Sequence, residues 1–117
     1  MTQKRSILTL SIIAAAGLLA ERFVTTNGAY PTAGQGAIGV TNTTAAIGAL
    51  VAVDALGTTV VTAGGVFARG AALAVGTTGK AVAAASGNVI VAVAQQASTA
   101  DGDRVEVFLI PNATPVT

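Results

Sequence analysis

Apolar and polar side chains alternate over residues 6–12, near the start of the chain. The apolar members of this segment share one face and are Leu8, Leu10 and Ile12. Thr9 and Ser11 lie on the opposite face. Because successive side chains of a β-strand point to opposite sides of the sheet, this period of two predicts a strand.

A second alternating segment occupies residues 104–110. Its apolar face carries Val105, Val107 and Leu109. Arg104 and Glu106 lie on the other face, so the pattern predicts a strand with one buried and one solvated side.

Short apolar runs fill the rest of the chain, with Gly, Pro, Asn and Asp between them. The further candidate strands are residues 22–25, 37–41, 50–54, 59–63, 72–75, 81–84 and 89–94. We expect residues 54–62 to form a hairpin that turns at Gly57. Residues 43–50 form at most a short helical turn, because Gly48 lowers the helix propensity. Many short strands with Gly-rich turns predict an all-β fold, a small single-domain β-barrel or sandwich with an extended N-terminal arm.

The length of 117 residues fits one domain, which we divide into an N-terminal arm or strand (1–20) and a β-barrel domain (21–117). Charged residues make up 9% of the chain, against about 25% in an average soluble domain. An 11.3 kDa monomer exposes on the order of 5,700 Å², or roughly one charge per 500 Å². We therefore expect much of the surface to be buried against other chains. The alternative is a surface that Thr, Ser, Gly and Ala make polar enough without charge.

The first twenty residues also resemble a secretory signal. Lys4 and Arg5 would form its basic region, residues 7–20 its apolar region and residues 14–16 its cleavage site. The strand-like alternation argues against this, and the apolar run of 14 residues is too short to cross a bilayer as a helix. We expect a strand or arm. A secreted or surface β-rich adhesin or fibre module with a cleaved signal remains the alternative.

The chain contains no Cys and no His. Disulfides, thiolate metal sites and Cys nucleophiles are thereby excluded, and the commonest general base and metal ligand are missing. The formal net charge of +1 favours no nucleic-acid surface. We expect no enzyme, no cofactor, no bound metal and no nucleic-acid or membrane partner.

Two glycine-rich segments imitate nucleotide-binding motifs. Residues 34–39 spell G-x-G-x-x-G, with Asp54 20 positions after Gly34, but Pro31 precedes the motif and no helix pattern follows it. Residues 76–80 resemble the end of a phosphate loop. Ala74, however, occupies the position of the first Gly of that motif, and Ala81 occupies that of its final Ser or Thr. We expect a loop and a turn. We also expect Asp101 and Asp103 to form a solvated turn, because calcium needs six or more ligands.

The order of the turn and strand residues resembles the small capsid cement, or head decoration, proteins of tailed bacteriophages. The resemblance covers nearly the whole chain and is carried by residues 22–24, 39–41, 51–57, 63–64, 70, 79–82, 94–98 and 102–107. It implies a compact β-barrel-like fold and a homotrimer at local three-fold positions of an icosahedral shell. It also implies a place on the outer surface of the virion, where the N-terminal segment contacts the major capsid protein.

The resemblance suggests a mechanism for capsid binding. Residues 6–13 would add as a strand to a sheet edge of the capsid protein, and binding across capsomers would stabilise the shell against the pressure of packaged DNA. The candidate contact residues are Leu8, Leu10 and Ile12, with Lys4 and Arg5 steering the approach.

Overall fold

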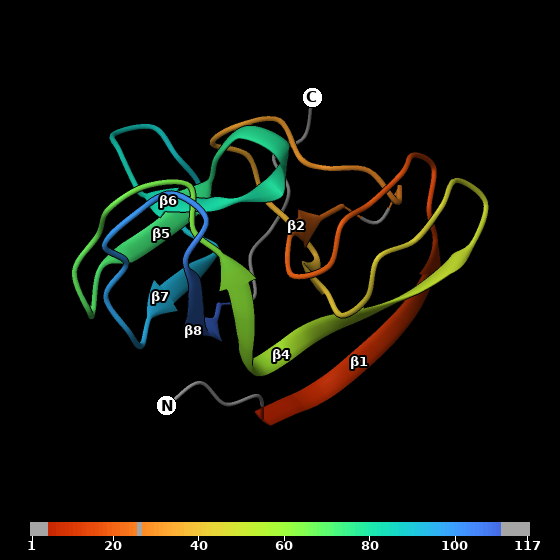
Figure 1. The fold of residues 1–117 in the computed structure, drawn as a ribbon, viewed down its shortest axis with the longest axis horizontal. Coiled ribbons are helices and arrows are strands. Elements are labelled where there is room, and N and C mark those ends of the chain that lie inside the picture. The colour runs from red at the N-terminus through yellow and green to blue at the C-terminus, as the bar shows by residue number, and fades with distance from the viewer. Residues whose placement is uncertain (1–4, 26, 111–117) are drawn as a thin grey trace.

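The computed structural model describes residues 5–25 and 27–110 of the chain (Figure 1). Its elements are β1 (Arg5–Ile13), β2 (Phe23–Val24), β3 (Gly39–Thr41), β4 (Leu50–Thr62), β5 (Ala72–Val75), a 3-10 turn η1 (Thr77–Gly79), β6 (Ala81–Ala83), β7 (Ala92–Ala94) and β8 (Arg104–Leu109). The eight described strands form one sheet, which confirms the predicted all-β class.

The sheet is antiparallel and curls toward closure. Its strand order is β2-β3-β4-β8-β7-β5-β6, and β1 pairs with β4 beside this path. A parallel bridge between Ala63 and Ala81 joins the end of β4 to the start of β6. The amide of Gly34 donates to the carbonyl of Val75 at 2.8 Å, which connects the loop before β3 with β5. These links bring the two ends of the strand order together and produce a nearly closed, barrel-like sheet.

The predicted hairpin at residues 54–62 is wrong, because β4 is one strand of 13 residues that bends in the middle (Figure 1). Its first part pairs with β1 and β3, and its last part pairs with β8. Gly57 has a φ of +95° at the bend, where the register between β1 and β4 is irregular. A glycine of positive φ can serve a bulge as well as a turn, and here it redirects the strand.

Two other segments differ from their predictions in extent. The strand expected over residues 89–94 is limited to β7, since Ile90 lies outside it and is 44% exposed. Residues 43–50 form no helix, and Ala45 instead makes an isolated antiparallel bridge with Leu18. No helix among the described residues is long and apolar enough to span a membrane.

Buried residues form two clusters. The larger one fills the barrel and includes Phe23, Val61, Leu73 and Val107. The smaller cluster lies beneath β1 and the first part of β4 and consists of Ala14, Leu18, Val24, Ala45, Val51 and Val53. Residues 14 and 18 of the predicted arm therefore contribute to the core. The division of the chain into an arm (1–20) and a barrel domain (21–117) stays a prediction.

Candidate binding surface

Strand β1 carries all but one of the predicted contact residues. Lys4 lies outside the described residues. The backbone of Arg5 is opposite Thr58 of β4, and that of Leu8 is opposite Leu56. The irregular register on both sides of Leu8 makes this the place where β1 follows the bend of β4.

Leu10 and Ile12 share a face of the sheet with Val53 and Val51, their partners on β4. Both valines are buried, and Ile12 packs against the smaller core cluster. Leu10 and Ile12 are themselves only partly exposed. The apolar face of β1 is thus turned toward the protein's own core, and the predicted contact set stays a prediction.

One edge of β1 is paired and the other points away from β4. The amide of Ala14 donates to the carbonyl of Ala49 at 2.9 Å, and the amide of Gly48 donates to the carbonyl of Ala14 at 2.7 Å. Because the backbone N–H and C=O groups of successive residues in a strand point to alternate edges, those of Ile12 also point toward β4. The N–H and C=O groups of Ser11 point toward the outward edge. Within the described residues β1 pairs only with β4, so this outward edge is a candidate site for another strand.

The far end of the outward edge is closed by a turn. The amide of Ala15 donates outward to the carbonyl of Gly28 at 2.9 Å. Gly28 has a φ of +80°, and a Cβ added there would collide with the carbonyl oxygen of Ile13. Only glycine permits this approach, so the turn marks the end of the outward edge of β1.

A buried carboxylate holds β1 in register. Asp54 is 1% exposed, and the hydroxyl of Thr59 donates to it at 2.8 Å. The hydroxyl of Thr9 on β1 donates at 3.2 Å, and the side-chain amide of Asn42 donates at 3.5 Å. Since a buried carboxylate is costly without hydrogen bonds, a slip of β1 that removed Thr9 would be penalised.

The nucleotide-like motifs have structural roles. Residues 34–38 form a loop leading into β3, where Gly39 lies so close to the carbonyl of Asp54 that no side chain would fit. The pocket lined in part by Ala37, Ile38 and Gly39 has a volume of about 10 Å³, which is room for about one water molecule. The segment ending at Lys80 is the predicted turn, formed around η1.

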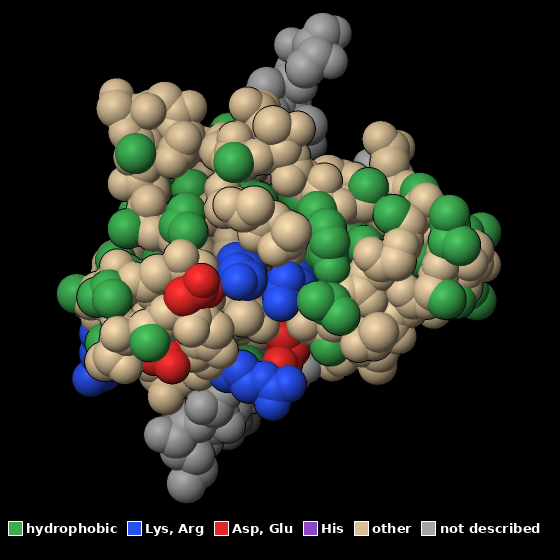
Figure 2. Space-filling view, turned by 45° about the horizontal axis from the view of Figure 1, so that its top comes forward, with side chains coloured by type: hydrophobic (Ala, Val, Ile, Leu, Met, Phe, Trp, Pro, Cys, Tyr) green, Lys and Arg blue, Asp and Glu red, His purple; other side chains and the backbone are tan. Residues whose placement is uncertain are grey.

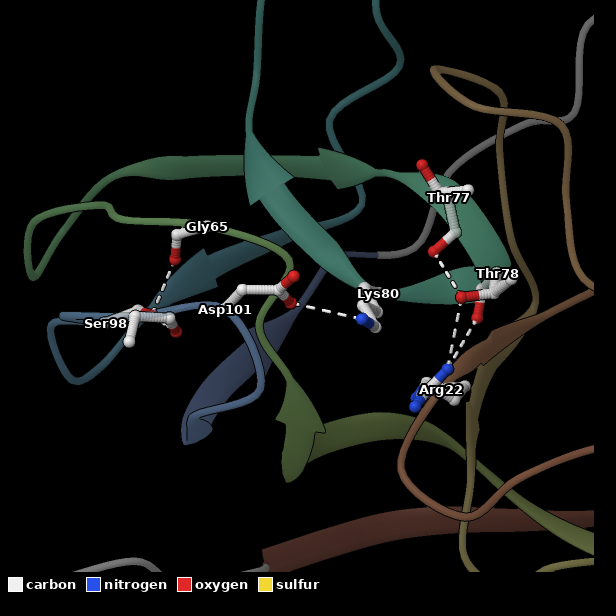
Figure 3. Close-up of polar contacts among 8 residues, drawn as sticks. Arg22, Gly65, Thr77, Thr78, Lys80, Ser98 and Asp101 are labelled. Atoms are coloured by element: carbon white, nitrogen blue, oxygen red, sulfur yellow. Dashed lines mark hydrogen bonds and ion pairs between the residues drawn. The ribbon is translucent and has the colours of Figure 1, made fainter.

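Polar side chains close the barrel where its two ends meet (Figure 3). The guanidinium Nη1 of Arg22, before β2, donates to the carbonyl and hydroxyl oxygens of Thr78 in η1, at 3.1 and 3.2 Å. The Nζ of Lys80 lies 3.1 Å from the Oδ1 of Asp101. These contacts join the start of β2, the η1 turn and the loop before β8.

A further ion pair joins β8 to the segment before β2. The Nε of Arg104 on β8 lies 2.6 Å from the Oε1 of Glu21, whose side chain is 14% exposed. Glu21 has a φ of +62°, and its backbone is held by Thr41 on one side and Thr62 on the other. We call Glu21, Arg22, Lys80, Asp101 and Arg104 the charged seam. Figure 2 shows basic and acidic side chains gathered near the centre of this face.

The acidic loop before β8 is a hydrogen-bonded turn. The backbone amide of Thr99 and then its hydroxyl hold the pKa of Asp103 below its usual value, because both donate to the ionised carboxylate at 2.9 and 3.1 Å. Asp101 pairs with Lys80. Among residues 5–25 and 27–110 there is no cluster of three or more acidic, His or Cys side chains that could hold a metal ion.

The end of the molecule where Ile13 of β1 lies beside Leu50 of β4 is apolar. Its most exposed large side chains are Ile13 (63%), Leu19 (50%), Ile47 (72%) and Leu50 (71%), which we call the apolar tip. Ile13 and Leu50 are direct register partners. Figure 2 shows hydrophobic side chains gathered there, at the right-hand end. The sequence analysis missed this surface, although Ile13 interrupts the polar face that Thr9 and Ser11 begin.

The fold and these surfaces define a small β-barrel-like structural module with an outward strand edge, a charged seam and an apolar tip. The family model described as phage cement protein matches residues 2–109, so the chain belongs to the phage cement protein family. It is a structural capsid decoration protein of the outer surface of a phage head, which confirms the resemblance.

A solved structure agrees with this assignment at the level of the fold. The N base of the head fiber protein gp8.5 of bacteriophage phi29 superposes with a TM-score of 0.75. The match has 19% sequence identity and covers 88% of this chain and 93% of that one. No curated protein sequence matches the chain significantly.

Proposed function

We propose that this protein binds the major capsid protein of a tailed phage as a homotrimer and stabilises the shell against the pressure of packaged DNA. It acts without catalysis, and its partners are the capsid and its own copies rather than nucleic acid or membrane. The observation that carries the proposal is the outward edge of β1, a strand of nine residues whose register is maintained by Asp54.

The proposed contact is strand addition. A capsid strand pairs with the outward edge of β1 through main-chain hydrogen bonds, while Leu8 and the exposed parts of Leu10 and Ile12 contact neighbouring side chains. Lys4 and Arg5 steer the approach by charge. Three copies of the edge on one trimer engage neighbouring capsomers together, so avidity makes modest single contacts strong.

Ser11 provides a direct test, because its amide points away from β4. Ser11→Pro removes that outward donor and leaves the β4 hydrogen bonds intact. Ser11→Ala is the matched control, since it removes only the hydroxyl. We expect Ser11→Pro to reduce binding to undecorated shells at least about tenfold in a co-sedimentation titration, and Ser11→Ala to bind like the wild type.

Thermal unfolding of both variants checks that the barrel is intact before binding is compared. Equal binding by Ser11→Pro and the wild type would show that the β1 edge is not the contact.

Two measurements test the rest of the proposal. Gel densitometry of purified particles should give about one copy per major capsid protein, as trimers at the three-fold positions require. Decorated shells should retain their DNA to a higher temperature than undecorated ones.

A further inference from the structure

The apolar face of β1 is less covered than the strand beside it. Val53 and Val51 of β4 are 0% and 1% exposed, whereas their register partners Leu10 and Ile12 are only half-buried. Ile12 also packs against the smaller core cluster. We call the face that carries Leu10 and Ile12 the inner face of β1. This face is apolar up to the outward edge, where no further strand covers it within the described residues (Figure 1).

The outward edge also lacks the features that protect a strand from pairing. Edge strands are commonly protected by Lys, by Pro or by a charged side chain, and residues 9–13 include none of these. Ser11 is exposed on the other face of β1, and its N–H and C=O groups point outward. A strand added at this edge would therefore pair with β1 and cover the inner face at the same time.

The regular part of the edge is short. It begins after Leu8, where the register with β4 is irregular, and it ends at Ile13. Beyond Ile13, the carbonyl of Gly28 accepts the outward amide of Ala15 at 2.9 Å and takes the place that a pairing strand would need. A partner segment can therefore be extended over about five residues, or roughly 17 Å, before it ends or turns away.

A second copy of β1 does not fit this edge. Two regular stretches of residues 9–13 can pair fully only about a two-fold axis at Ser11, which places Thr9 of one copy opposite Ile13 of the other. The residues before Thr9 in each copy then run into the position that Gly28 occupies beside Ala15 of the other copy. The edge therefore favours a shorter segment of a different protein.

We propose that the capsid segment bound by β1 is a short alternating strand with apolar side chains opposite Leu10 and Ile12. These two side chains complete the cover of the inner face, while the residue opposite Ser11 faces solvent. A slip of one residue would place polar side chains over Leu10 and Ile12, so the inner face selects the register. This inference rests on the proposed strand addition and names the kind of segment that the edge selects.

Neighbouring residues on opposite faces of β1 test the role of the inner face. Leu10→Thr keeps a strand-forming residue but removes apolar surface from the inner face, and Ser11→Thr is the matched control on the exposed face. In co-sedimentation with undecorated shells, we expect Leu10→Thr to weaken binding at least about tenfold and Ser11→Thr to bind like the wild type. Circular dichroism at the assay temperature verifies that both variants are folded.

Photo-cross-linking identifies the segment itself and does not depend on the stability of Leu10→Thr. The chain has no native Cys, so Ser11→Cys can carry a single benzophenone maleimide. Val66→Cys is the control label, because Val66 is 71% exposed and lies outside β1. After irradiation on shells, mass spectrometry should place the Ser11→Cys cross-link in one capsid segment whose two residues beside the cross-linked one are apolar. Val66→Cys should not cross-link to that segment.

The remaining outcomes separate this inference from the proposed function. If Leu10→Thr is folded and binds like the wild type, or if the cross-linked capsid segment is polar on both sides of the cross-link, the inference is wrong while strand addition stands. If Ser11→Cys cross-links to another copy of this chain, the edge serves self-association and the inference is wrong. If Ser11→Pro also binds like the wild type, the proposed contact itself is wrong.

Discussion

The charged seam and the apolar tip are built from similar Ala-, Gly- and Thr-rich loops, yet they use their side chains in opposite ways. At the seam, long polar side chains reach across strands and bind groups of the same chain, as Arg22 does with Thr78. At the tip, backbone hydrogen bonds hold the loops and the large apolar side chains point outward. The side chains of the seam thus stabilise the fold of the chain itself, whereas the tip leaves its large apolar side chains exposed.

The largest expected effect lies beneath the tip. Leu18 is 1% exposed at the centre of the smaller cluster, so Leu18→Ala should lower the free energy of unfolding by about 2–5 kcal/mol. The adjacent control Leu19→Ala removes a side chain that is 50% exposed and should cost about 0.5 kcal/mol or less. Chemical denaturation measures both. A small loss for Leu18→Ala would mean that the tip has no packed base of its own.

Two glycines of positive φ sharpen the comparison. A Cβ at Gly79, beside the seam, would lie 2.6 Å from the carbonyl oxygen of Phe23, whereas one at Gly48, in the tip, would meet nothing within 4 Å. We expect Gly79→Ala to destabilise the fold by about 3 kcal/mol, from strain and overpacking together. Gly48→Ala should cost about 1 kcal/mol, from backbone strain alone. Similar losses for the two variants in thermal unfolding would refute a tightly closed seam.

The ion pair between Lys80 and Asp101 should contribute less. The two side chains are 27% and 65% exposed, so solvent screens their attraction. We expect Lys80→Met to lower the free energy of unfolding by about 0.5 kcal/mol, and high salt to reduce the difference from wild type. Adding Asp101→Asn to Lys80→Met should cost little more, as a double-mutant cycle can measure. A loss of several kcal/mol would show that this pair, rather than barrel packing, closes the seam.

The smallest effect concerns pH near the seam. The pKa of Asp103 is lowered in the folded state, so its carboxylate adds stability above the usual Asp pKa of about 3.9 and loses it as the pH falls through the folded value. Asp103→Asn should melt slightly below the wild type at neutral pH. In strongly acidic buffer the two melting temperatures should converge. A difference that stays constant across this range would contradict the assignment to Thr99.

The sequence predicted the strands best where alternation was regular. Residues 104–110 match β8 closely, because their period of two places Val105, Val107 and Leu109 in the core. Residues 72–75 match β5 without any alternation, because this short run is apolar throughout and mostly buried. Gly57 misled the prediction, since only the pairing of β4 with β1 distinguishes a bend from a hairpin turn. For the candidate site, alternation identified β1 but could not show that Ile12 contacts its own core.

The contacts of the charged seam could not be predicted from local sequence patterns. Arg22 and Thr78 are 56 positions apart, and their contact depends on how far the sheet curls. The tip required knowing that Ile13 and Leu50 are register partners, although both were visible as apolar residues. The charge-poor composition predicts surface that is buried against other chains, which stays a prediction, and it could not indicate which side of the barrel would supply that surface.

The long antiparallel ladder between β1 and β4 gives the protein a preferred direction of mechanical strength. A pull along the axis of β1 loads the rungs from Arg5 to Ile13 in shear, so they share the force and must yield nearly together. A pull across the strand instead opens the same rungs one after another, as a zipper opens. A partner that pulled on β1 along its axis would therefore be resisted by the whole ladder, whereas a force lifting the strand outward would separate the paired residues in succession.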